Sequence, residues 1–116
     1  MKDYSLSKDY RLLNKRDFAS LRSKDAVKIH FKTFKAIYRF NGLGHARVGF
    51  AVSKKVGKAN VRNSIKRNIR EWFRQSNIKE TDADLFIIVH PKYKLFGPDK
   101  FLKTLSEELN KIVVKI

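Results

Sequence analysis

The chain has 116 residues, of which 42% are hydrophobic, enough for one domain with a modest core. Its 27 Lys and Arg against 11 Asp and Glu give a net charge of +16, which indicates an anionic partner such as a nucleic acid or an acidic membrane surface. Apolar runs are too short for a membrane span, the first residues lack the apolar core of a signal peptide, and the absence of cysteine excludes disulfides and thiolate metal sites. We therefore expect a single cytoplasmic domain over residues 1–116, without a membrane or small-molecule partner.

The first predicted element is a short helix over residues 15–22. It follows a polar segment, residues 1–10, that we expect to be loosely ordered. Asn14 is a good N-cap residue, and Phe18 and Leu21 fall on the expected inner face of the helix.

Three strands are predicted next. Residues 27–40 are expected to form one strand with a bulge or bend near Thr33, because the apolar residues change parity there. A turn at residues 41–44 leads to a strand at 47–53, and the two strands are expected to pair as an antiparallel hairpin. Residues 84–89, DLFIIV, form a near-continuous apolar run that is typical of a buried strand.

The C-terminal part is predicted to contain a basic loop over residues 92–99 and an amphipathic closing helix over about residues 99–114. With a helix at residues 60–75, the order becomes α-β-β-α-β-α. This order predicts an α+β fold, a two-layer sandwich in which helices pack on a small sheet.

The most informative stretch is residues 54–74, KKVGKANVRNSIKRNIREWFR, with eight basic residues and one acidic residue, Glu71. Its apolar residues form one helical stripe, made of Val61, Ile65, Ile69 and Trp72. The basic residues cover the rest of the helix, with Lys66 and Arg70 expected at the centre of an acid-free face. Like charges four residues apart destabilise a helix slightly, and an external polyanion is the simplest compensation.

This basic face is therefore predicted to bind nucleic acid, and an idle solvated face is the alternative. The predicted contact residues are Lys54, Lys55, Lys58, Arg62, Asn63, Lys66, Arg67, Arg70 and Arg74. Gly57 precedes the helix, where it would let backbone N–H groups approach a phosphate near the positive end of the helix dipole. An ordinary strand-to-helix turn is the alternative for this glycine.

Catalytic motifs are lacking. His30, His45 and His90 do not have metal-ligand spacing, and the sequence has no P-loop, nucleophile elbow or paired-carboxylate motif. Asp82 and Asp84 could hold Mg²⁺, but a solvated strand entry is the more ordinary interpretation. We do not expect the chain to cut a bond by itself, and no catalytic residue is predicted.

Residues 54–74 resemble the signature of the bacterial ribonuclease P protein subunit, and residues 11–18 and 41–49 are also similar to that family. The resemblance covers essentially the whole chain, in order and with matching spacing. One position departs, because Ser64 stands where the family commonly has arginine. Ser64 is expected off the centre of the cationic face, so we expect a lost peripheral contact and not a lost function.

The resemblance implies an α/β sandwich in which the helix at residues 60–75 crosses between parallel strands with a left-handed sense, against the usual right-handed preference. It also implies a division of labour. The basic helix and the preceding loop would contact the catalytic ribonuclease P RNA. The protein would assist the Mg²⁺-dependent endonucleolytic removal of the 5′ leader of precursor tRNA, while the RNA and its Mg²⁺ ions carry catalysis.

The resemblance further implies a leader-binding cleft between the first helix and one face of the sheet. The matching positions are Phe18, Arg22, Lys35, Ile37 and Ala51. Arg22 stands where relatives often have an aromatic residue, and Ile37 where some have tyrosine. A cleft with fewer aromatic residues and more cations would bind the leader more through phosphates than through base stacking.

Three other interpretations stay open at this point. The main one is a ribosomal or other structural RNA-binding protein without a role in cleavage. A DNA-binding helix protein is weakened by the lack of a helix-turn-helix pair, and a protein-only nuclease by the lack of a carboxylate cluster.

Overall fold

The computed structural model describes residues 10–12, 21–22, 24–109 and 111. Its strands and helices are β1 (Val27–His30), β2 (Phe34–Phe40), β3 (Arg47–Val52), α2 (Ala59–Gln75), the 3-10 helix η2 (Asn77–Glu80), β4 (Ala83–Val89), α3 (Tyr93–Lys103) and the π-helix η3 (Thr104–Leu109). The predicted helix at residues 15–22, apart from its last two positions, and the predicted loose segment before Tyr10 lie outside the described residues.

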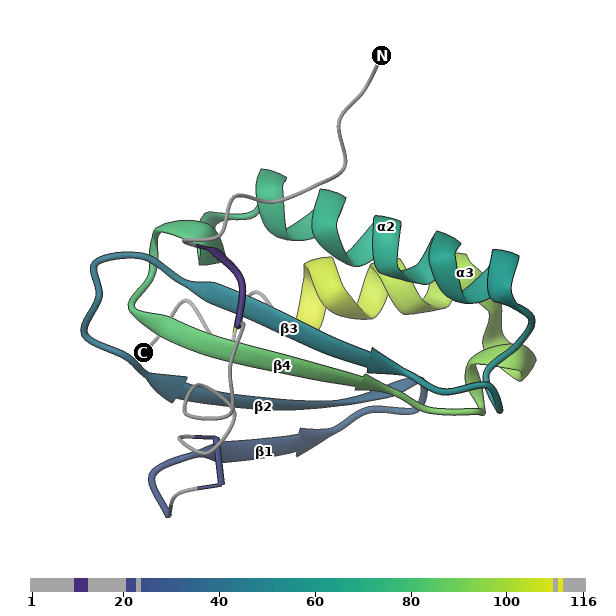
Figure 1. Ribbon diagram of the computed structural model, residues 1–116, viewed down its shortest axis with the longest axis horizontal. Coiled ribbons are helices and arrows are strands. Elements are labelled where there is room, and N and C mark those ends of the chain that lie inside the picture. The colour runs from purple at the N-terminus through teal and green to yellow at the C-terminus, as the bar shows by residue number, and fades with distance from the viewer. Residues whose placement is uncertain (1–9, 13–20, 23, 110, 112–116) are drawn as a thin grey trace.

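The four strands form one mixed sheet in the order β1-β2-β4-β3. Strand β4 is antiparallel to β2 and parallel to β3, and β1 is antiparallel to β2. Figure 1 shows α2 and α3 lying on the same side of this sheet. The predicted two-layer α+β fold with a small mixed sheet is confirmed.

The prediction of one strand over residues 27–40 was wrong, because this segment folds back on itself. Val27 lies opposite Tyr38 and His30 opposite Lys35, so β1 and β2 form an antiparallel hairpin. The N–H of Phe31 donates to the carbonyl oxygen of Phe34 at 2.8 Å and closes the turn between them. The change of apolar parity near Thr33 therefore marks a reversal of the chain and not a bulge.

The predicted antiparallel hairpin between residues 27–40 and residues 47–53 was also wrong, because β4 lies between β2 and β3. The run DLFIIV is the most apolar of the strands, and it takes an interior position between β2 and β3, where both of its edges are paired. The connection after β2 is tied to the start of β4 by a hydrogen bond of 2.8 Å from the N–H of Asn41 to the carbonyl oxygen of Asp82. Helix α2 thus joins two parallel neighbours, as the resemblance implied, and the handedness of this crossover stays a prediction.

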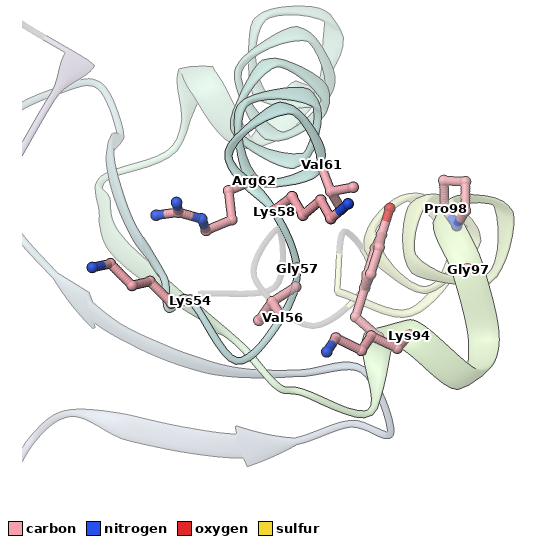
Figure 2. Close-up of a pocket in the computed structure, with 10 residues that line it drawn as sticks. Lys54, Val56, Gly57, Lys58, Val61, Arg62, Lys94, Gly97 and Pro98 are labelled. Atoms are coloured by element: carbon pink, nitrogen blue, oxygen red, sulfur yellow. The ribbon is translucent and has the colours of Figure 1, made fainter.

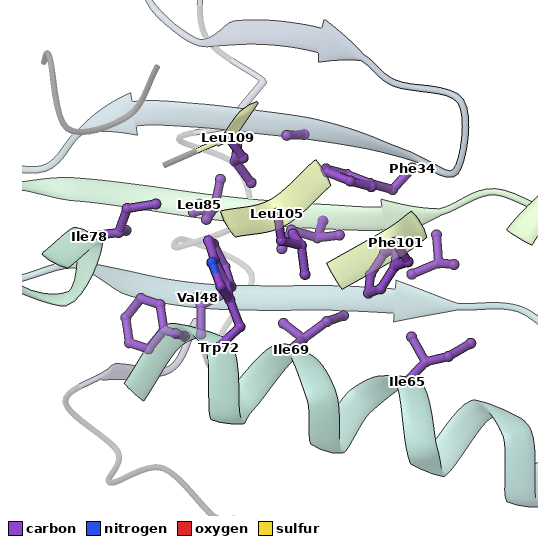
Figure 3. Close-up of a cluster of buried hydrophobic side chains, with 14 of the residues drawn as sticks. Phe34, Val48, Ile65, Ile69, Trp72, Ile78, Leu85, Phe101, Leu105 and Leu109 are labelled. Atoms are coloured by element: carbon purple, nitrogen blue, oxygen red, sulfur yellow. The ribbon is translucent and has the colours of Figure 1, made fainter. Parts of the chain in front are cut away.

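The predicted apolar stripe of α2 is confirmed. Ile65 and Ile69 are fully buried, Trp72 is nearly so, and Val61 packs at the margin. Phe73, which was left out of the stripe, is also fully buried. Figure 3 shows Ile65, Ile69 and Trp72 facing the sheet, together with side chains of the C-terminal helical segment. The same core includes Phe34, Val48, Ile78, Leu85, Ile87, Phe101, Leu105 and Leu109.

The predicted loop over residues 92–99 is partly helical. One helical turn begins at Tyr93, whose N–H donates to the carbonyl oxygen of His90 at 2.9 Å. Gly97 then breaks the helix with φ 77° and ψ 177°, and Pro98 opens the second part of α3. Proline suits the first helical position, where its missing N–H costs nothing. Leu105 and Leu109 of the predicted closing helix are buried, and residues 112–116 lie outside the described part.

Candidate nucleic-acid interface

The basic residues of α2 lie on two sides of the helix. Arg62, Lys66 and Arg70, spaced four apart, are half-buried. The guanidinium of Arg70 lies 5.2 Å from the centre of the Phe50 ring, so this row follows edge strand β3. Asn63, Arg67 and Arg74 occupy the outer side, where Asn63 and Arg67 are exposed and Arg74 is half-buried. Lys66 and Arg70 keep their place in the middle of the basic arc of the helix, and the most exposed part of that arc is near Arg67.

An acidic side chain borders this surface. Glu71 lies 3.7 Å from the guanidinium of Arg74 and accepts a hydrogen bond of 2.9 Å from Gln75. The sequence predicted a cationic face without acidic partners, and this prediction was wrong, because Glu71 pairs with Arg74. Ser64 is exposed and lies seven residues before Glu71, so both are on the same side of the helix. This position agrees with the expected peripheral place of Ser64.

A hollow of about 720 Å³ opens at the N-terminal end of α2, between its first turn and the bent start of α3 (Figure 2). Four cationic side chains line it, namely those of Lys54, Lys58, Arg62 and Lys94. The helix, all of whose residues are described, has neither a side-chain cap nor an acidic residue in its first turn. The uncapped N–H groups and the helix dipole add positive potential at the same place.

Gly57 lines this hollow, but close packing alone explains it. A Cβ atom at position 57 would lie 3.0 Å from Cγ1 and 3.1 Å from Cβ of Val61. A side chain here would therefore push against the first turn of α2. This supports the interpretation of an ordinary strand-to-helix turn.

The described leader-cleft positions lie on the face of the sheet opposite the helices. Lys35 and Ile37 alternate with buried neighbours on β2, so they point away from the core. Ile88 of β4 lies directly opposite Lys35 on one side and Ala51 on the other. These three residues therefore form a row across the sheet, which we call the open-face row. Ile37 belongs to the next row, opposite Phe86.

Two hollows lie along this face. One of about 270 Å³ is lined by Leu21, Arg22, Ile37, Phe86 and Ile88. The other, of about 560 Å³, is lined by the open-face row and by His30, Phe31, Phe34, Ser53, Lys55, Val89, His90 and Pro91. Because Ile88 lines both, the two hollows are neighbours. The structure thus brings four of the five predicted cleft positions to one surface, and Phe18 lies outside the described residues.

The N-terminal segment reaches this face as well. The N–H of Leu12 donates to the carbonyl oxygen of Val48 at 3.2 Å, so the segment pairs with the outer edge of β3. A Cβ atom at Gly49 would lie 3.2 Å from Cδ1 of Leu12 and 3.0 Å from Cδ1 of Phe86. The glycine thereby leaves room for Leu12 to pack against the sheet.

Asp84 is a structural anchor and not a strand entry in solvent. It is 2% exposed and accepts hydrogen bonds from Nε and Nη2 of Arg47 at 2.8 and 2.7 Å. Asn41 donates a third, at 2.9 Å. Asp82 accepts from the N–H of Gly44. Within the described residues, no three Asp, Glu or His side chains come close enough to hold a metal ion.

The comparison with known families decides the identity. The family model for ribonuclease P matches residues 6–115. The chain belongs to the ribonuclease P protein family. Members of this family are the protein component of a ribonuclease holoenzyme, so this chain has an RNA partner.

Individual relatives agree with this assignment. The ribonuclease P protein component of Citrifermentans bemidjiense is 41% identical over 88 residues, which cover 76% of this chain and 75% of the relative. That of a Psychrobacter species is 31% identical over 116 residues, covering 99% and 89%.

Solved ribonuclease P proteins share the fold. The protein from Thermotoga maritima superposes with a TM-score of 0.70 at 28% identity, covering 91% of this chain and 96% of that one. A mutant of the Staphylococcus aureus protein gives 0.75 at 29% identity, covering 90% and 89%.

Several residues of this ribonuclease P protein surface were missed from the sequence. Phe86 and Ile88 share a parity within DLFIIV, but a continuous apolar run hides which positions face outward. His30 was given no binding role from the sequence, and its place beside Lys35 depends on the unexpected hairpin. Within the described residues, no helix combines the length and apolarity that crossing a bilayer requires.

Burial raises the pKa of Tyr38, and burial together with nearby Asp99 raises that of Tyr93. Both phenols therefore stay neutral around neutral pH. The charge of the surfaces described above comes from Lys and Arg.

Proposed function

We propose that this chain is the protein subunit of ribonuclease P, acting in the cytoplasm on precursor tRNA. Helix α2 and the loop before it would bind the catalytic ribonuclease P RNA. The open face of the sheet would hold the single-stranded 5′ leader. The RNA subunit would then cleave the leader hydrolytically to give the mature 5′ end of the tRNA.

The observation that carries this proposal is the separation of two surfaces. The basic residues of α2 lie on the helical side of the molecule, whereas the open-face row lies on the opposite side of the sheet. A protein that only binds one folded RNA needs one such surface. Two surfaces suit a protein that holds a catalytic RNA and a separate substrate strand together.

The open face suits a single strand in chemical terms. Its centre is apolar, with Ile37, Phe86 and Ile88, and Lys35 adds positive charge beside it. Backbone phosphates would contact the cations, while bases would lie over the apolar centre. Single-stranded binding of this kind combines charge with stacking and tolerates different base sequences.

The described residues do not fit a protein-held Mg²⁺ site. Asp84 is committed to Arg47 and Asn41, and the described acidic residues do not gather elsewhere. When bound by the RNA subunit, Mg²⁺ would supply the activation of water and the stabilisation of the scissile phosphate. This chain's residues would bind and orient the two RNA molecules.

Reconstitution tests the proposal. The purified full chain would be mixed with transcribed ribonuclease P RNA and a precursor tRNA at low Mg²⁺ concentration, with each component omitted in turn. We expect efficient leader removal only when the chain and the RNA are both present. Binding without any effect on leader removal would select a structural RNA-binding protein instead. Cleavage by the chain alone would select a protein-only nuclease.

A further inference from the structure

The bent segment over residues 92–98 exposes two large apolar side chains. Leu95 is 80% exposed and Phe96 is 40% exposed. Both lie in the single helical turn before the break at Gly97. Neither belongs to the basic helix or to the open-face row.

This turn is held in one shape by its own contacts. Lys92 donates its N–H to Nδ1 of His90 at 3.0 Å, and Leu95 donates to the carbonyl oxygen of Lys92 at 2.9 Å. Tyr93 is buried, with its ring 5.5 Å from that of Phe101 in an edge-to-face arrangement. The turn therefore presents Leu95 and Phe96 on a fixed support, which lowers the entropy cost of binding through them.

Cations surround the two apolar side chains. Lys32 of the β1–β2 turn places its Nζ 5.8 Å from the centre of the Phe96 ring. Residues 90–100 carry three lysines, Lys92, Lys94 and Lys100, all exposed, against one aspartate. Exposed aromatic and aliphatic groups inside a cationic surface match the nucleobases and phosphates of unpaired RNA.

The turn is also continuous with the proposed interface for the catalytic RNA. Lys94 and Pro98 line the same hollow as Lys58 at the start of α2. In Figure 2 Lys58 and Lys94 both point into the space between the α2 end and the bent segment. An RNA that contacts Lys58 would have Leu95 and Phe96 within its reach along the same surface.

We propose that residues 92–98 form a second contact with the catalytic RNA, in which Phe96 and Leu95 pack on unpaired nucleobases and the neighbouring lysines bind the adjoining phosphates. This inference rests on the proposed function, because the occupant is ribonuclease P RNA. It assigns a non-ionic part of the affinity to a segment outside the basic helix.

The test compares Phe96→Ala with a matched control, Phe40→Ala. Phe40 is also an exposed aromatic residue, 61% accessible, but it lies at the end of β2 away from Lys32. The turn that carries Lys32 adjoins the opposite end of β2, at Phe34. Affinity for transcribed ribonuclease P RNA would be measured for both full-length variants at several salt concentrations. Loss of one stacked ring should weaken binding about five- to a hundredfold. The slope of log affinity against log salt should match the parent, because no phosphate contact is lost. The control should bind like the parent.

A further variant, Phe96→Trp, keeps an aromatic face and should retain parental affinity. Loss of affinity in Phe96→Ala but not in Phe96→Trp, with an unchanged melting temperature, would support stacking. Parental affinity in Phe96→Ala would overturn the proposal. So would self-association of the parent through this turn that Phe96→Ala abolishes without changing RNA affinity. The proposed function would survive either result if the parental chain still supports leader removal. It fails only if the parent itself does not.

Discussion

Replacing Ile65 by aspartate tests which side of α2 faces the core. Ile65 is fully buried in the middle of the α2 stripe. The substitution would lose the burial of the isoleucine side chain, worth about 1.5–3 kcal/mol. It would also bury a carboxylate without a partner. Together these terms should lower the free energy of unfolding by about 3 kcal/mol or more, out of the roughly 5–15 kcal/mol of an ordinary domain.

The neighbouring position provides the control. Ser64→Asp adds the same charge to the same helix, but Ser64 is exposed, so the stability should stay within about 0.5 kcal/mol of the parent. Ile65→Val should fall between them, at about 0.5–1.5 kcal/mol. Urea unfolding can be followed by the fluorescence of Trp72, the only tryptophan of the chain. Equal midpoints for Ile65→Asp and Ser64→Asp would refute the placement of Ile65 in the core.

Three further predictions concern the basic helix, the open face of the sheet and the buried Asp84. Arg67→Ala should flatten the salt dependence of binding to ribonuclease P RNA by about 0.7–0.9 in log–log slope at an unchanged melting temperature. Arg70→Ala should flatten it likewise and should also lower the melting temperature, because it removes the contact with Phe50. If both variants keep the salt dependence of the parent, the basic face does not bind the RNA. Lys35→Ala should weaken binding of leader-bearing precursor tRNA but not of mature tRNA, and a parental ratio of the two affinities would remove Lys35 from the leader path. Asp84→Ala should destabilise the chain by about 3 kcal/mol without changing the Mg²⁺ dependence of cleavage by the holoenzyme, and a shift in that dependence would contradict its structural role.

The features that the sequence predicted well are local ones. The spacing of Ile65, Ile69 and Trp72 is a property of one helix, so the buried side of α2 could be derived without knowing its partners. The same holds for the buried character of β4. Phe73 was missed because it lies at the edge of the apolar stripe of α2. The charged residues beside it made the buried side of the helix look narrower than it is.

Strand pairing could not be derived in this way, since it depends on contacts between distant segments. Alternation in residues 27–40 predicts extended chain, but it does not show where the chain reverses. Likewise, nothing in residues 34–52 shows that β4 will come between two strands that follow each other in sequence. The turn at residues 41–44 favours a hairpin, and the stronger burial of β4 overrides that local preference.

The same distinction between local features and long-range contacts applies to the candidate site. The basic residues of α2 were identifiable from composition, but the contact between Arg70 and Phe50 required the packing of α2 against β3. The resemblance supplied Lys35, Ile37 and Ala51, whereas the strand register showed that Ile88 lies between Lys35 and Ala51. Phe18 stays a prediction.

The central position of β4 has a consequence for how the chain folds during translation. The strands on either side of β4 leave the ribosome first, and β3 lacks its sheet neighbour until residues 83–89 have been synthesised. The β1–β2 hairpin can form early, because its contacts are local, but β4, which connects β2 to β3, is the last strand to be synthesised. The strongly cationic α2 therefore emerges before the surface that buries its apolar side is complete. A nascent chain that stops before residue 83 would expose Ile65 and Ile69 beside a dense positive charge, and it would be a ready target for chaperones or for non-specific capture by RNA.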